Sequence, residues 1–307
     1  MHTSSVNVRT PLAVIPALVA LLAAVAAGCG GSAMAVPELS SFTNAAQTSA
    51  AADSARFSLE AKVAMSGIDK KLSFSADGGF DTPAKRSEMS VDLSSVAELM
   101  KGFASGFGGN LTGDFGNPED WKLEVIQDGD TAYVHFPLLA KQLPGGKTWL
   151  KGDAKTLSSA DAGQLRQFGS LAGTDPRDVF GLLKAVSGSI AAVGTDELHG
   201  VETSHYKATI DIAKLEQLVP AAQRDSLGSF EQGARQAGLA EIPLEIWIDS
   251  EQRVRKLSID VDAKQPGTSA ALKASLVVEL YDYGKALELE LPSADQVADA
   301  ATLKRPS

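Results

Sequence analysis

Apolar and polar residues alternate along much of the chain, which is typical of strands with one buried face and one solvated face. From Arg56 to Ser66 the apolar residues Phe57, Leu59, Ala61, Val63 and Met65 recur at every second position, and they alternate with the polar residues Arg56, Ser58, Glu60 and Lys62. The same alternation recurs in segments 72–80, 89–93, 121–125, 132–136, 206–210, 244–248, 257–261 and 272–280. Asp128-Gly129-Asp130 is typical of a tight hairpin turn. The pattern predicts an antiparallel sheet of about ten one-sided strands.

The middle of the chain changes to helical spacing. Apolar residues recur every three or four positions in segments 162–171, 176–186, 212–219 and 223–238. Asp175-Pro176 is typical of a helix start, and Gly188 of the end of that helix. We expect an α+β fold, in which these amphipathic helices cover the concave face of a strongly curved half-barrel sheet. Because a large sheet curls and helices rarely fill its concave side, we also expect an apolar cavity.

The segment from Ser94 to Asn117 combines helical spacing of apolar residues with six glycines. Each glycine disfavours a helix by up to about 1 kcal/mol relative to alanine. We therefore expect a mobile apolar flap, with Phe103, Phe107, Leu111 and Phe115 as the residues that close the cavity mouth or touch a membrane or an apolar cargo. The alternative is an ordinary connection whose aromatic residues pack on the core.

The N-terminus has the parts of a secretory signal. A short polar start with Arg9 precedes an apolar run from Leu12 to Ala27, and small residues follow at a cleavage site. Cys29, the one cysteine of the chain, comes directly after Ala26-Ala27-Gly28. This pattern resembles the bacterial lipobox, in which the thiol receives a diacylglyceryl group. An uncleaved membrane helix and an ordinary secretory signal are the alternatives.

These features predict how the chain is organised. Residues 1–28 are the expected signal peptide, 29–40 a flexible tether after the acylated Cys29, 41–300 the globular domain, and 301–307 a tail. The acyl chains would anchor the protein to the extracytoplasmic face of the cell membrane, because each buried methylene adds about 0.8 kcal/mol of membrane affinity. Loss of the segment that carries Arg9 changes the formal net charge from −10 to −11. Nucleic acid is therefore not an expected partner.

Residues with catalytic or metal-binding chemistry are few. The chain has no HExxH motif, no GxSxG motif and no phosphate loop ending in GK[ST]. His135 alternates with apolar neighbours and is expected to face solvent, whereas His199 and His205 flank a predicted hairpin where a metal pair is conceivable. Asp260 and Asp262 are expected on the wet side of a strand. We expect no enzymatic activity, no metal and no cofactor.

Three segments carry a resemblance to a known family. Residues 243–257 (PLEIWIDSEQRVRKL) place Trp247 before a turn led by Asp249, and residues 281–292 (YDYGKALELELP) form a closing strand followed by proline. Residues 146–151 (GKTWLK) are a shorter match. These segments resemble actinobacterial lipoproteins of the LppX/LprA/LprF/LprG type, which are similar to the carriers LolA and LolB.

The resemblance implies a curved antiparallel half-barrel whose concave side encloses an apolar cavity for acyl chains. It therefore implies a protein that binds, and in some family members moves, a lipid or lipoglycan of the cell envelope. From the alternation we expect the cavity to be lined by Phe57, Leu59, Phe74, Met89 and Val91 of the strands, and by Val179 and Leu183 of the covering helices. Ordinary core packing is the alternative for each.

The sequence leaves two other functions as alternatives. A sensing or scaffolding lipoprotein would have a filled interior and would bind an envelope protein through the outer sheet face, where Trp247 is expected to be exposed. A hydrolase acting on an envelope lipid would need a nucleophile and a base, which the sequence does not indicate.

Overall fold

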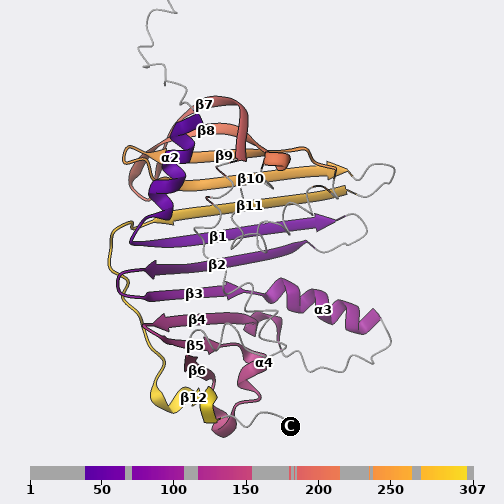
Figure 1. Ribbon diagram of the computed structural model, residues 1–307. Helices are drawn as coiled ribbons and strands as arrows, with labels where there is room; N and C mark the ends of the chain where they lie inside the picture. The colour runs from indigo at the N-terminus through magenta and orange to yellow at the C-terminus, as the bar shows by residue number, and fades with distance from the viewer. Residues whose placement is uncertain are drawn as a thin grey trace, which may run out of the picture. The chain divides into compact units, whose positions relative to one another are not determined.

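A single large sheet dominates the computed structural model of the chain (Figure 1). The structure describes residues 39–65, 71–106, 117–153, 180, 183, 185–214, 235, 238–264 and 271–302, all of which belong to the compact unit Val36–Ser307. The strands within these ranges are β1 (Ser54–Met65), β2 (Leu72–Asp81), β3 (Arg86–Asp92), β4 (Lys122–Asp128), β5 (Thr131–His135), β6 (Trp149–Asp153), β7 (Val186–Leu198), β8 (Val201–Asp211), β9 (Glu241–Asp249), β10 (Val254–Lys264), β11 (Ala271–Tyr281) and β12 (Val297–Asp299).

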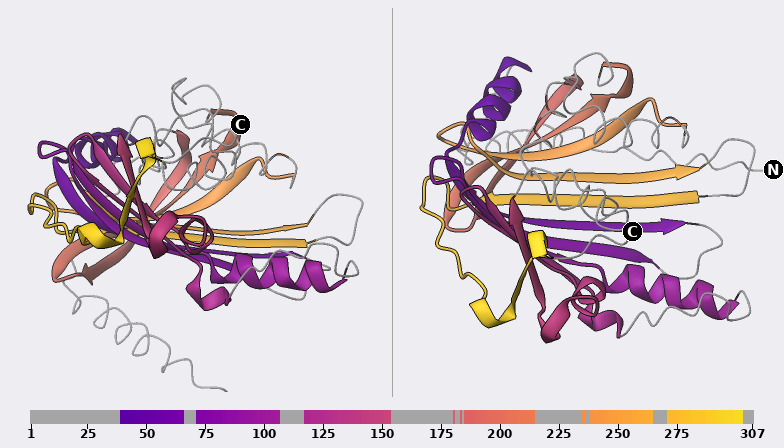
Figure 2. Two further views of the ribbon diagram at one scale, coloured as in Figure 1. Left: turned by 90° about the horizontal axis from the view of Figure 1, so that it is seen from below. Right: turned by 60° about the horizontal axis from the view of Figure 1, so that its bottom comes forward.

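The strand order in the sheet is β12-β6-β5-β4-β3-β2-β1-β11-β10-β9-β8-β7. Every pair is antiparallel except β12 and β6, which run parallel after the chain returns to that edge. Strand β1 pairs with the late strand β11 over ten residue pairs, so the N-terminal and C-terminal parts of the unit share the centre of the sheet. Two further views show that the sheet is bent and twisted (Figure 2). The predicted class, a curved antiparallel sheet with helices, is confirmed.

Three α-helices lie wholly within the described ranges: α2 (Leu39–Ala50), α3 (Ser94–Gly106) and α4 (Pro137–Ala140). The short 3₁₀ helices are η1 (Pro118–Asp120), η2 (Pro144–Gly146), η5 (Ala294–Gln296) and η6 (Ala300–Thr302). In helix α2, Phe42, Ala46 and Ser49 are buried at helical spacing, so its apolar stripe packs on the sheet. None of the helices in these ranges is long and apolar enough to cross a lipid bilayer.

Several sequence-based boundaries are wrong. The sheet has twelve described strands rather than about ten, because the alternation does not reveal β7 or the short strands β6 and β12. Val186 and Gly188, expected at the end of a helix, lie in β7, whereas Phe180 and Leu183 have 3₁₀ geometry. Helix α2 begins at Leu39, inside the expected tether.

The remaining expected helices fall largely on parts of the chain outside the described residues. This applies to segments 162–171 and 176–179, and to most of 212–219 and 223–238. Of the last two segments, only residues 212–214, 235 and 238 are described; residues 212–214 and 235 are helical, and Gly238 lies in a turn.

Candidate functional site

One face of the sheet, which we call the inner face, carries apolar side chains in continuous rows across the strands. Residues directly opposite each other in neighbouring strands point to the same side, so the strand register defines each row. One row, from β8 to β4, consists of Tyr206, Ile246, Leu257, Val278, Leu59, Ala76, Val91 and Leu123. The alternation in the sequence thus produces an apolar surface that crosses eight strands.

Two separate hydrophobic clusters cover parts of the inner face. The first lies over β7 to β11 and includes Phe42 of α2 together with Phe180 and Leu183. The second lies over β2 to β5 and includes Ala97 of α3 and Trp121, which makes an edge contact with the Phe136 ring at 5.6 Å between centroids. Each cluster is a dense core of its own.

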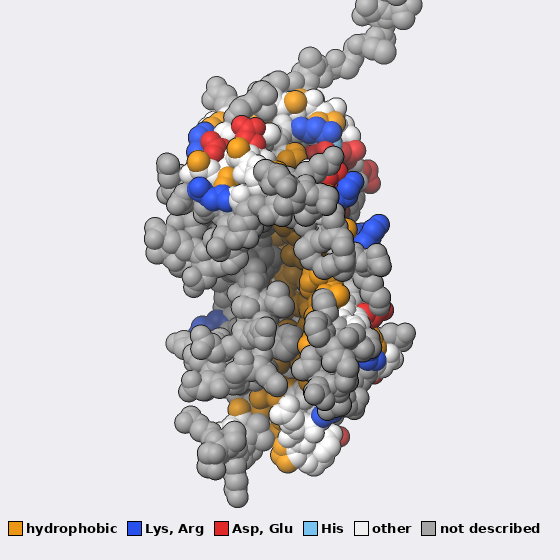
Figure 3. Space-filling model, turned by 90° about the vertical axis from the view of Figure 1, so that its right-hand side faces the viewer, with side chains coloured by type: hydrophobic (Ala, Val, Ile, Leu, Met, Phe, Trp, Pro, Cys, Tyr) orange, Lys and Arg blue, Asp and Glu red, His pale blue; other side chains and the backbone are white. Residues whose placement is uncertain are grey.

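The inner face between these clusters is less covered. Leu59, Ala61, Val63, Phe74 and Leu276, on β1, β2 and β11, are only half-buried. Register places Ala61 directly between Phe74 and Leu276, so these five residues form one surface, which we call the half-covered patch. Figure 3, which looks from the side where β1 and β10 end, shows hydrophobic side chains lining a hollow in this part of the molecule.

The cavity residues expected from the sequence divide between the clusters and the patch. Phe57, Val91 and Leu183 are buried within the clusters. Leu59 and Phe74 belong to the half-covered patch, and Met89 is a half-buried neighbour that contacts both clusters. Residues 29, 107, 111, 115 and 179, which include the expected acylation site, lie outside the described residues.

A close approach of side chain and main chain marks the border of the patch. The Phe57 ring lies over Gly78 of the neighbouring strand: a β-carbon on Gly78 would come within 2.7 Å of Phe57 Cζ and 2.3 Å of the Glu88 carbonyl oxygen. Only glycine fits there without displacing its neighbours. Gly78 therefore allows Phe57 to lie flat on the sheet at the edge of the first cluster.

The segment expected to be a mobile flap begins as a regular helix. Residues Ser94–Gly106 form α3, and Ala97 on its inner side is fully buried in the second cluster. This part, which includes Phe103, is therefore a regular helix, and a role in closing the cavity mouth stays a prediction. Packing of the helix against the sheet outweighs the cost of Gly102 and Gly106. The rest of the segment, residues 107–116, lies outside the described residues.

The opposite, outer face carries polar side chains, yet the aromatic side chains of Trp247 and His205 on this face are buried. Trp247 is only 8% exposed, because the His205 ring stacks on it at 4.0 Å between centroids. The indole N–H donates to Asp196 Oδ2 at 2.7 Å, and His205 Nε2 lies 2.7 Å from Glu245 Oε2. Trp247 is on the expected face, but the expectation that it is exposed is wrong.

Glu245 belongs to the same outer-face network. Partial burial alone would raise the pKa of its carboxyl, but hydrogen bonds and charges from Lys207 and His205 outweigh that effect and hold the pKa below its usual value. Glu245 is therefore an ionised partner for both residues at neutral pH.

The other two histidines of the described chain are also tied to aromatic residues. His135 Nδ1 lies 2.8 Å from the Thr148 carbonyl oxygen, and its ring tilts over Trp149, so this histidine is half-buried rather than directed freely into solvent. His199 stacks on Tyr281 and bonds Glu279 at 3.0 Å. Among the residues that the structure describes, no group of three or more His, Cys, Asp or Glu side chains is arranged to hold a metal ion.

The hairpin that carries the family resemblance is held by a buried ion pair. Arg255 Nε donates to Asp249 Oδ2 at 2.7 Å, and the other Asp249 oxygen accepts main-chain N–H groups from Glu251 and Arg253. The guanidinium of Arg255 also lies over the Tyr283 ring, 4.9 Å from its centroid. This hairpin and the closing segment thus form one structural unit.

Comparisons with known proteins give weak sequence matches. No protein-family model matches the chain. It is 24% identical over 228 residues to an uncharacterised 31.2 kDa protein in the rplA-rplJ intergenic region of Streptomyces griseus, a match that covers 69% of this chain and 72% of that protein.

Structure comparisons return proteins of the type that the sequence motifs resemble. The LprF structure from Mycobacterium bovis is similar at a TM-score of 0.43 with 13% identity, covering 85% of this chain and 100% of that one. The lipoprotein LppX from Mycobacterium tuberculosis is similar at 0.37 with 15% identity, covering 82% and 97%. A LolA-superfamily protein from Nitrosomonas europaea is similar at 0.23 with 8% identity, covering 83% and 96%. All three likenesses are distant in sequence and in backbone geometry.

Proposed function

We propose that this protein is a membrane-anchored lipoprotein that binds acyl chains of an envelope lipid or lipoglycan against the inner face of its sheet. Transport of that lipid across the envelope is an extension of the same proposal. The bound chain would lie on the half-covered patch, formed by Leu59, Ala61, Val63, Phe74 and Leu276.

The observation that carries this proposal is the incomplete cover of the patch. Neighbouring apolar residues in the same rows, such as Leu257 and Ile246, are fully buried, whereas the patch residues are half-buried. Burial of apolar surface contributes about 25 cal/mol per Å², so a hydrocarbon chain that covers the patch gains affinity without any specific polar contact. Contiguous exposed apolar surface often marks a ligand or partner site.

The proposed activity is binding, so no bond is made or broken. The titratable groups with displaced pKa values in the described chain belong to the outer face and to the closing segment, and they have structural partners. Glu245 and Glu279 are held in ion pairs. Burial raises the pKa of the Tyr283 phenol, whose hydroxyl donates a hydrogen bond to the Val254 carbonyl oxygen at 2.7 Å.

The location that we propose is the extracytoplasmic face of the cell membrane, with the acylated Cys29 as the anchor and no nucleic acid or cofactor involved. The lipobox-like sequence Ala26-Ala27-Gly28-Cys29 supports it. Replacement of Cys29 by Ser should move the protein from the membrane fraction to the soluble extracytoplasmic fraction. A variant that stays in the membrane fraction would contradict the anchor but leave lipid binding open.

Native mass spectrometry tests lipid binding itself. The mature chain, residues 29–307 with Cys29→Ser, would be purified from bacteria without detergent and sprayed under conditions that preserve non-covalent complexes. We expect adducts of lipid mass that disappear after extraction with organic solvent. A ligand-free protein that also fails to take up added palmitate would exclude the proposal.

A further inference from the structure

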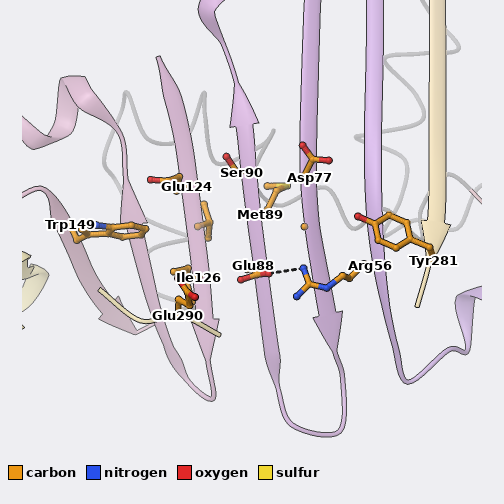
Figure 4. A pocket seen from close by; sticks show the side chains of 12 residues that line it. Arg56, Asp77, Glu88, Met89, Ser90, Glu124, Ile126, Trp149, Tyr281 and Glu290 are labelled. Carbon is orange, nitrogen blue, oxygen red and sulfur yellow. Dashed lines mark hydrogen bonds and ion pairs between the residues drawn. The ribbon is translucent and has the colours of Figure 1, made fainter. Parts of the chain in front are cut away.

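The outer face carries a second surface feature, on the opposite side of the sheet from the patch. It is a groove of about 430 Å³ that runs across the strands (Figure 4). One wall is formed by Asp77, Glu124 and Trp149, which the register places in one row. The other wall is formed by Tyr281, Arg56 and Glu88, which lie in the next row.

The charge of the groove is strongly unbalanced. Arg56 Nη1 lies 3.1 Å from Glu88 Oε1, so these two charges compensate each other. Asp77, Glu124 and Glu290 also line the groove, and none of them makes an ion pair with another residue of the described chain. Three carboxylates are thus available to an outside partner, and the chain as a whole is acidic. An anionic ligand would be repelled.

Aromatic rings lie at the two ends of the groove and are held in place by histidines. Trp149 is tilted against His135 at 5.3 Å between centroids, and Tyr281 is stacked on His199 at 4.4 Å. Burial, together with the nearby Asp77 carboxylate, raises the pKa of Tyr281, so its phenol stays neutral. Rings fixed in this way can accept a cation on their faces.

We propose that this groove docks an extended basic segment of a partner protein. Lysine and arginine side chains of that segment pair with Asp77, Glu124 and Glu290, and their aliphatic stems lie on the buried Ile126. Six strand-to-strand steps separate Tyr281 on β11 from Trp149 on β6. At about 4.8 Å per step this is roughly 29 Å, the length of about eight to nine extended residues.

The position of the groove has a consequence for the protein as a whole. Because the inner and outer faces point in opposite directions, a partner seated in the groove leaves the half-covered patch open. The proposal goes beyond lipid binding and does not depend on it.

Fluorescence anisotropy with a labelled octa-arginine peptide tests the proposal on the mature chain with Cys29→Ser. The double variant Asp77→Asn/Glu124→Gln should weaken binding about five- to tenfold, since two ion pairs are lost and each exposed ion pair contributes only modestly. Trp149→Ala should weaken binding about threefold. Arg56→Met should strengthen binding, because it removes the one cation and releases Glu88.

The control is a second pair of carboxylates with the same charge. Glu197 and Glu202 are exposed, face each other across the β7–β8 hairpin and lie outside the groove. We expect Glu197→Gln/Glu202→Gln to change the dissociation constant by less than twofold.

Equal weakening in the two double variants would show attraction by diffuse charge and would overturn the proposal. A second result would also overturn it: binding of neutral maltohexaose that is lost in Trp149→Ala, with no change in octa-arginine binding. That result would assign the groove to a glycan.

Discussion

Two parts of the inner face have the same sequence pattern but different packing. On β9 and β10, the apolar residues Ile246 and Leu257 have no exposed surface, because Phe42 of α2, Phe180 and Leu183 pack with them in the first cluster. On β11, β1 and β2, Leu276, Leu59 and Phe74 alternate in the same way but stay half-buried. The alternation therefore shows which way a side chain points, and a distant segment of the chain decides whether it is covered.

This difference separates stability from ligand binding. A fully buried side chain contributes to the free energy of folding, whereas a half-buried one retains apolar surface that a ligand can cover. Substitutions in the two parts can test this separation, and the largest expected effect is on stability.

Truncation of a leucine in each part should give unequal losses of stability. Leu257→Ala leaves a cavity in the covered part and should lower the free energy of unfolding by about 2–5 kcal/mol. Leu276→Ala, on the neighbouring strand but in the half-covered patch, should cost about half as much or less. Urea unfolding followed by circular dichroism measures both, and equal losses would mean that the two parts are equally packed.

Replacement of an alanine by tryptophan should lower stability in the covered part but not in the half-covered patch. Ala208 and Ala61 lie in one row across the sheet, joined by Leu244, Ile259 and Leu276. Ala208→Trp overpacks the covered part and should cost about 1–3 kcal/mol of stability.

Ala61→Trp should keep the stability but reduce lipid binding. The indole would occupy the surface that we assign to the acyl chain, so palmitate affinity should fall about tenfold in a fluorescence displacement assay. A strongly destabilised Ala61→Trp would show that the patch is already filled.

The border between the two parts can be tested at Gly78. Gly78→Ala forces its new β-carbon against the Phe57 ring and should destabilise the protein by about 1–3 kcal/mol. The control is Gly102→Ala in α3, where a β-carbon would meet nothing within 4 Å and should stabilise the helix by up to about 1 kcal/mol. Thermal unfolding compares the two, and a harmless Gly78→Ala would contradict the close contact.

The smallest expected effect concerns pH and the outer face. Partial burial would raise the pKa of Glu279, but hydrogen bonds and charges from Lys256 and His199 outweigh it, and the pKa of Glu245 is lowered in the same way. A carboxyl with a lowered pKa in the folded state stabilises the protein above its ordinary value of about 4.5, and that stabilisation is lost as pH falls below it.

Stability should therefore decline as pH falls below about 4.5, by less than about 1 kcal/mol for each of these partly exposed groups. The variant Glu245→Gln/Glu279→Gln should show a shallower decline over this range in urea unfolding. An unchanged slope would assign the acid sensitivity to other carboxyl groups.

Most strands can be predicted because alternation over five or more residues is typical of a half-buried strand and does not fit the period of a helix. The start of β7 cannot be predicted in this way, since Val186 and Gly188 follow a segment with helical spacing. Helix α3 could not be predicted, because its glycines disfavour a helix and the packing of Ala97 against the sheet, which outweighs that cost, is a tertiary contact. Helix α2 has a signal in Phe42, Ala45, Ala46 and Ser49, which recur at helical spacing.

The outer-face features could not be predicted from the sequence. Burial of Trp247 depends on His205, which is its cross-strand neighbour and 42 positions away in the chain. The groove between Tyr281 and Trp149 depends on the register of seven strands. Registers of this kind arise from tertiary pairing, and the local pattern does not contain them.

Photo-crosslinking can show where a bound acyl chain lies on the sheet. A palmitate analogue with a diazirine near the end of its chain would be bound to the mature protein, irradiated and mapped by peptide mass spectrometry. We expect labels on inner-face residues of β1, β2 and β11, above all Leu59, Phe74 and Leu276, and loss of these labels in Ala61→Trp. Labels confined to the outer face, or no specific label at saturating ligand, would contradict acyl-chain binding at the half-covered patch.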